Sequence, residues 1–110
     1  MNRTLEREEE HTLPAVQPVG PLQQVLAALA DPVRLEMVRR LAERDEPIAC
    51  ADLYADISKS TASHYFKTLR EAGLTERVVI AGQTHQRLRV REVEDALPGL
   101  LSSVVAAAGQ

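Results

Sequence analysis

The chain has 110 residues, enough for one domain with a modest core. It contains two tyrosines, one phenylalanine and no tryptophan, so aliphatic side chains must fill that core. No apolar run approaches the length that spans a membrane, and the glutamate-rich N-terminus is unlike a secretion signal, so we expect a cytoplasmic protein with no membrane association. The single cysteine, Cys50, excludes a disulfide within the chain.

The net charge of −3 hides an uneven distribution of charged residues. Residues 1–31 hold two basic and five acidic residues, whereas residues 59–91 hold seven basic and two acidic residues, a local charge of +5. A basic patch attracts phosphates even when the whole chain is acidic. Residues 59–91 are therefore the candidate nucleic-acid-binding segment.

The first 20 residues are acidic and then contain Pro14, Pro18 and Gly20, a pattern that predicts a mobile arm preceding one domain of residues 21–110. Pro21 is placed to open a helix through Ala30. The apolar stripe of this helix is wide for its length, so we expect part of it to contact a second subunit. The stripe consists of Leu22, Val25, Leu26 and Leu29.

Asp31-Pro32 is typical of a helix start, with a capping carboxylate followed by proline at the first helical position. We expect this helix to run to about Arg44 and to end before Pro47. Residues 48–55 are interpreted as a short helix, followed by a turn at residues 56–57. The inward residues expected for the long helix are Leu35, Val38, Leu41 and Ala42.

A second capped helix is predicted between Ser58, a good N-cap, and Gly73, a good C-terminal stop. Its apolar residues Ala62, Phe66 and Leu69 recur at helical spacing and should face the core. Together with the short helix before it, this helix would form a helix-turn-helix in which it is the reading helix.

The opposite side of the reading helix carries hydroxyls, an imidazole and an ammonium, which suit phosphates and the floor of a DNA major groove. The alternative is an ordinary solvated helix face. The candidate DNA contacts on this helix are Lys59, Ser60, Thr61, Ser63, His64 and Lys67, with Thr68 on the same side.

Residues 74–80 and 86–90 alternate in polarity around a turn at residues 81–85, which predicts a β-hairpin, the wing. Arg87, Arg89 and Arg91 are expected to share one face, where they would contact phosphates or a minor groove, or keep an exposed strand soluble. The wing candidates for DNA contact are Gln83, Thr84, His85 and Arg87.

Residues 92–97 are expected to form a helical turn, and an uncharged final helix follows Pro98-Gly99. The apolar side chains of such a helix must be buried, and pairing with the residue 22–29 helix of another copy would bury them. We therefore expect a homodimer that presents two reading helices to half-sites about one DNA turn apart. The predicted interface consists of Leu22, Val25, Leu26, Leu29, Leu100, Leu101, Val104 and Val105.

Several runs together resemble the ArsR family of winged helix-turn-helix repressors over roughly residues 22–101. They are Ala30-Asp-Pro-Val-Arg-Leu-Glu-Met-Val-Arg-Arg-Leu41, Ala51-Asp-Leu53, Ser58-Lys-Ser-Thr-Ala-Ser-His-Tyr-Phe-Lys-Thr-Leu-Arg-Glu-Ala-Gly73 followed by Leu74, and Gly82 in a strand-rich segment. The resemblance implies an α+β, mostly helical fold with a two-stranded wing, a dimer built from the first and last helices, binding to double-stranded DNA, and repression as the default role.

Members of that family often sense metals; one of their known sites is absent here and another is incomplete. One is a Cys-x-Cys pair before Asp-Leu, where this chain has Ala49-Cys50-Ala51; the other needs C-terminal histidines, which are absent. A site for nickel or zinc would therefore combine imidazoles with carboxylates, such as Glu8 or Glu9, within one subunit or between two subunits. The alternative is that the histidines have no metal role. The candidate ligands are His11, His64, His85, Glu94 and Asp95.

No residue pattern indicates catalysis, because neither Cys50 nor His64 has an evident partner and no phosphate-cradling loop or zinc spacing is present. Cys50 is interpreted as an inert buried thiol, with a redox sensor as the alternative. Two other functions stay open. The chain could act through a partner protein, or it could respond to a small ligand bound between the dimer helices.

Overall fold

The computed structural model describes residues 11–12 and 16–109. These residues form helices and a small antiparallel sheet of strand order β1-β3-β4-β2. In chain order the elements are β1 (His11–Thr12), α2 (Leu22–Leu29), α3 (Pro32–Arg44), β2 (Ile48–Ala49), the 3₁₀ turn η1 (Cys50–Asp52), α4 (Lys59–Glu71), β3 (Thr75–Ile80), β4 (Gln83–Leu88), α5 (Val90–Ala96) and α6 (Leu100–Ala108).

The start of α3 confirms the predicted capping. The Asp31 carboxylate accepts hydrogen bonds from the N–H groups of Val33 at 2.8 Å and Arg34 at 3.1 Å, with proline at the first helical position. The helix ends at Arg44, as expected, where the next residue adopts a left-handed conformation. Pro21 differs from its expected role, because it is the extended cap residue of α2 and the helix begins after it.

The expected helix over residues 48–55 is wrong. Ile48 and Ala49 instead form β2, in which Ile48 lies opposite Gln86 of β4, and only one 3₁₀ turn follows. A helix of two turns is costly to nucleate, whereas the open edge of β4 offers backbone partners and a buried position for the β-branched Ile48. The helix before the reading helix is thus reduced to a single turn.

The wing is the β3–β4 hairpin, and its turn is tighter than the sequence predicted. Ile80 pairs with Gln83, so the turn contains only Ala81 and Gly82, both with positive φ (51° and 82°), as a type I′ turn requires. Residues 83–85 therefore belong to β4 rather than to the turn. The strand ends at Leu88, and Val90 begins α5 instead of extending the strand.

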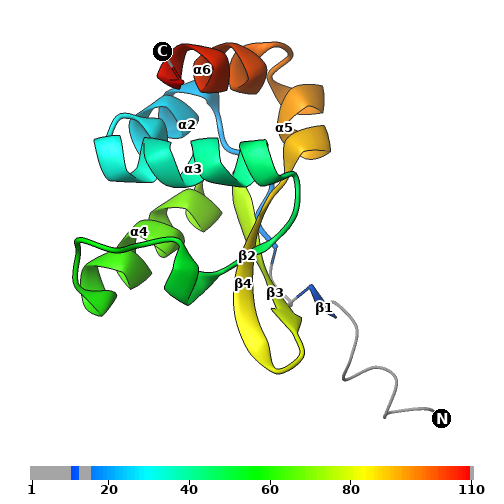
Figure 1. The fold of residues 1–110 in the computed structure, drawn as a ribbon. Coiled ribbons are helices and arrows are strands. Elements are labelled where there is room, and N and C mark those ends of the chain that lie inside the picture. Colours follow the sequence, from blue (N-terminus) through cyan, green and yellow to red (C-terminus); the bar gives the residue numbers. More distant parts are fainter. Residues whose placement is uncertain (1–10, 13–15, 110) are drawn as a thin grey trace, which may run out of the picture.

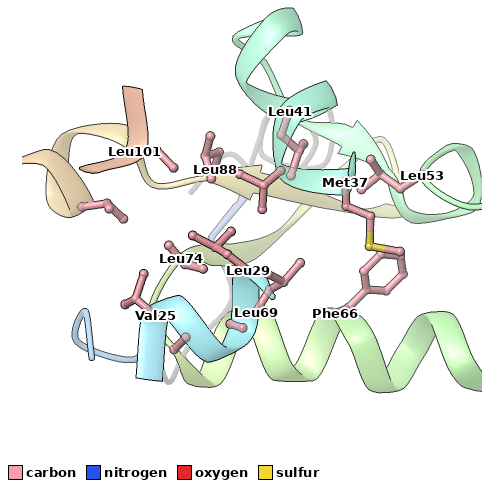
Figure 2. Close-up of a cluster of buried hydrophobic side chains, with 14 of the residues drawn as sticks. Val25, Leu29, Met37, Leu41, Leu53, Phe66, Leu69, Leu74, Leu88 and Leu101 are labelled. Carbon is pink, nitrogen blue, oxygen red and sulfur yellow. The ribbon is translucent and has the colours of Figure 1, made fainter. Parts of the chain in front are cut away.

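The core lies where the helices meet the base of the hairpin. Figure 1 shows α6 close to α2 and α3, with α4 on the other side of α3 and the hairpin extending beside α4. Figure 2 shows aliphatic side chains from all of these elements converging, and Met37 pointing towards the single phenylalanine, Phe66. Buried residues of this core include Val25, Val38, Leu41, Leu69, Leu74, Leu88, Val93 and Leu101.

The segment before α2 packs against the C-terminal end of α4. The N–H of Gly20 donates to the Ala72 carbonyl at 2.8 Å, and Gln24 Nε2 donates to the Glu71 carbonyl at 3.1 Å. These bonds satisfy carbonyls that a helix end leaves without partners. The described residues of the predicted arm, 11–12 and 16–20, thus contact the domain. The architecture is an α+β winged helix-turn-helix, as expected.

Candidate nucleic-acid interface

The helix α4 begins at a serine cap that leaves its positive end exposed. Ser58 Oγ accepts from the N–H of Thr61 at 3.1 Å and donates to the Thr61 hydroxyl at 2.9 Å. Gly73 has a φ of 80° just beyond the other end. Both predicted signals are confirmed, and so is the buried stripe of Ala62, Phe66 and Leu69.

The polar side chains predicted to contact DNA lie along the exposed side of α4. Lys59, Ser60, Ser63, His64 and Lys67 are exposed, whereas Thr61 and Thr68 are half-buried. Lys67 Nζ lies 3.9 Å from Glu71 Oε2. Both side chains are largely exposed, and such pairs contribute little to stability. The ammonium can therefore turn from Glu71 to a phosphate at little cost.

Tyr65 fixes the orientation of α4 relative to α3, a link that the sequence analysis missed. Its hydroxyl donates to Asp31 Oδ2 at 3.2 Å, and the Arg34 guanidinium lies 5.1 Å from its ring centroid. Burial acts to raise the pKa of Asp31, but the N–H groups of Arg34 and Val33, the Tyr65 hydroxyl and the Arg34 charge together lower it. One ionised carboxylate thus caps α3 and holds the reading helix.

The wing places its predicted contacts at and near the tip of the hairpin. Gln83 and Thr84 are exposed, and the Nδ1–H of half-buried His85 donates to the Gln83 carbonyl at 3.0 Å. Arg87 is half-buried, and its Nε lies 2.9 Å from Glu76 Oε2 across the hairpin. Arg87 is thus engaged within the sheet, while the tip offers neutral polar groups.

Arg89 and Arg91 do not share a strand face with Arg87, contrary to expectation. Arg89 is buried after the end of β4, and its Nη1 donates to the carbonyls of Gly73, at 2.9 Å, and Gln17. Arg91 lies on α5. Because β4 ends earlier than predicted, the alternation of side chains between the two faces of a strand does not apply to Arg89 and Arg91. Arg89 instead joins the residue 16–20 segment to the end of α4.

Comparisons with known proteins agree with this geometry. A family model described as a helix-turn-helix domain matches residues 29–78, which include α3, η1 and α4. An uncharacterized HTH-type transcriptional regulator, YceK of Bacillus subtilis (strain 168), is 36% identical over 83 residues, covering 74% of this chain and 83% of the relative. The chain belongs to the helix-turn-helix transcriptional regulators.

As a regulator of this class, the protein binds DNA, controls transcription and is not an enzyme. Its helix-turn-helix consists of η1 and α4, and the wing follows directly. Among the described residues, no helix is long and apolar enough to cross a membrane.

The residues predicted for a dimer interface fall into three groups that differ in exposure. Leu22 and Leu26 on α2 are 47% and 44% exposed. Leu100, Val104 and Val105 on α6 are half-buried. The remaining three, Val25, Leu29 and Leu101, are buried in the core of the subunit itself.

The candidate metal ligands of the regulator are distributed over separate elements. His11 belongs to β1, His64 to α4 and His85 to β4, while Glu94 and Asp95 belong to α5. Glu94 Oε1 accepts the N–H of Gly99 at 3.1 Å. Within residues 16–109, no three His, Cys, Asp or Glu side chains are grouped so that they could hold a metal ion.

Proposed function

We propose that the protein is an ArsR-type repressor that acts in the cytoplasm as a homodimer, with α4 in the major groove and the wing tip at the flanking backbone. The observation that carries this proposal is the exposed polar side of α4, capped at its positive end. Hydroxyls and an imidazole can hydrogen-bond base edges and phosphates, while Lys59 and Lys67 supply charge. Repression would follow from occlusion of polymerase at the operator.

The dimer would form through α2 and α6. Leu22 and Leu26 are exposed apolar residues on α2, and the half-buried valines of α6 extend this apolar surface. Self-association of one such surface gives a two-fold dimer. Two α4 helices would then read half-sites separated by about one DNA turn.

A response to nickel or zinc is a separate part of the proposal. Because the described residues of one subunit hold no ligand group of three, such a site would combine His11, His64 or His85 with carboxylates of both subunits. Fluorescence anisotropy of operator DNA in chelator, and then with nickel or zinc added, tests it. A metal-linked regulator shifts its DNA affinity, whereas equal affinities contradict metal sensing by these ions.

The DNA contact of Lys67 is tested through the salt dependence of binding. We expect Lys67→Ala to weaken binding to all sequences and to reduce the slope of log affinity against log salt by about one, because one phosphate contact is lost. Arg44→Ala is the matched control, since this exposed cation lies at the far end of α3. An unchanged slope for Lys67→Ala would refute its phosphate role.

His64 has a different expected role, because an imidazole on the exposed side of α4 can bond to base edges. We expect His64→Ala to change the ranking of operator variants rather than the salt slope. Competition between operators that differ at single base pairs measures this ranking. A uniform loss over all operators would contradict base recognition by His64.

A further inference from the structure

A hollow of about 550 Å³ lies between α4, the hairpin and the turn around Cys50. Lys59, Ser63, Phe66 and Arg70 are spaced four, three and four residues apart, so they form one stripe of α4 that faces this hollow. The opposite wall is the hairpin face that carries Arg77, Thr84 and Gln86. Ala49, Cys50, Ala51 and Tyr54 close one end, and Gln83 completes the lining.

The lining is cationic. Among the described residues it contains Lys59, Arg70 and Arg77 and no carboxylate. Burial lowers the pKa of the Arg70 guanidinium, and the positive charge of Arg77 lowers it further. The second effect means that the two guanidiniums repel each other. An anion between them would relieve this repulsion and accept charge-assisted hydrogen bonds from both.

Gln86 provides an independent sign of a missing partner. It is 1% exposed and lines the hollow, and its Nε2 donates to Cys50 Sγ at 3.4 Å. Its buried Oε1 has no hydrogen-bond partner among the described residues. Buried polar atoms are rarely left without partners, so this oxygen calls for a donor. A half-turn of the amide would let the Cys50 thiol donate to Oε1 and would leave the buried Nε2 in need of an acceptor.

We infer that this hollow binds a small organic oxyanion, a carboxylate or phosphate monoester on an apolar body, which regulates DNA binding. Arg70 and Arg77 would hold the oxyanion, and the Phe66 and Tyr54 side would contact the apolar body. Lys59, Ser63, Gln83 and Thr84 line the same hollow and are also the DNA contacts proposed above. The bound anion would neutralise the positive charge of Lys59, Arg70 and Arg77 and weaken DNA binding. DNA would weaken anion binding to the same extent.

Phenyl phosphate is the probe for the free protein, titrated by calorimetry at constant ionic strength. We expect saturable binding of one molecule per subunit, weakened roughly tenfold or more by Arg70→Gln or by Arg77→Gln, because each removes a charge-assisted contact. Arg44→Gln is the matched control and should bind as the wild type does. Benzyl alcohol, which lacks the oxyanion, should not bind. Absence of saturable binding to the wild type, or binding that neither variant weakens, would overturn the inference.

Anisotropy of operator DNA separates a free effector from a backbone phosphate of DNA. We expect phenyl phosphate to weaken DNA binding by the wild type and not by Arg70→Gln, at equal ionic strength. If Arg70→Gln weakens DNA binding while phenyl phosphate neither binds nor competes, the cations contact DNA only and the effector site is refuted. This coupling rests on the proposed DNA surface, but calorimetry of the free protein does not, so the two proposals can fail separately.

Discussion

At the scale of single residues, Asp31 links the start of α3 to the reading helix and makes that link depend on pH. Its carboxylate accepts two backbone N–H groups of α3 and the Tyr65 hydroxyl of α4, and its pKa lies below the ordinary value. The unfolded chain therefore binds this proton more readily than the folded chain. The stabilisation is fully present above about pH 4 and is lost as the pH falls through the lowered pKa.

We therefore expect the unfolding free energies of the wild type and Asp31→Asn to converge as the pH falls from about 6 to about 3. Urea unfolding followed by circular dichroism measures the difference at each pH. Ser58→Ala removes an uncharged cap and should cost about 1 kcal/mol at both pH values. A constant difference between the wild type and Asp31→Asn would contradict the role of the charge.

Single residues also show what the sequence can predict about the site. Ser58, Asp31 and Gly73 act through backbone within a few positions, so their roles were predicted correctly. The Tyr65–Asp31 bond joins residues 34 positions apart, and Gln86 reaches Cys50 over 36 positions. No local pattern marks such pairs, because they form only after the elements pack. The identities of the DNA contacts remain predictions.

At the scale of elements, the residue 16–20 segment and the end of α4 are packed together at Gly73. Its φ of 80° already disfavours a side chain, and a Cβ there would overlap the Pro18 carbonyl and Val19 Cα. Gly82 has a similar φ of 82° but faces open space. Alanine substitutions at the two glycines therefore separate the loss of stability caused by the backbone conformation from the loss caused by the close approach of residues 18–19.

We expect Gly82→Ala to cost about 1 kcal/mol of stability from the left-handed backbone alone. Gly73→Ala should cost about 1 to 3 kcal/mol more, because the backbone of residues 18–19 must move. Urea unfolding of the two variants gives the comparison. Equal costs would mean that the segment does not pack against Gly73 in solution.

The elements that the sequence predicted well are those with their own start and stop signals. Helices α3, α4 and α6 and the existence of the hairpin follow from caps, proline, glycine and apolar spacing. The failures lie where tertiary contacts decide. Residues 48–49 become a strand because β4 offers an edge, and the five-residue turn shortens to two because Ala81 accepts a positive φ.

At the scale of the whole molecule, the proposed dimer predicts a specific sensitivity on α2. We expect Leu26→Glu to raise the dimer dissociation constant by about a hundredfold, because a two-fold interface would contain the buried charge twice. Val90→Glu is the matched control, since Val90 is 43% exposed, against 44% for Leu26, and lies on α5 outside the predicted interface. Analytical ultracentrifugation measures both. A wild type that stays monomeric, or a Leu26→Glu variant as dimeric as the wild type, would contradict the dimer.

DNA is expected to bind the surface that α4 and the wing tip form. Nuclear magnetic resonance of the isotope-labelled protein, titrated with operator DNA, tests it most directly. We expect the largest amide shifts on residues 58–68 and 81–85, with α2 and α6 little changed. Shifts concentrated on α2 and α6, with α4 unaffected, would show that DNA binds elsewhere and would overturn the assignment of the reading helix.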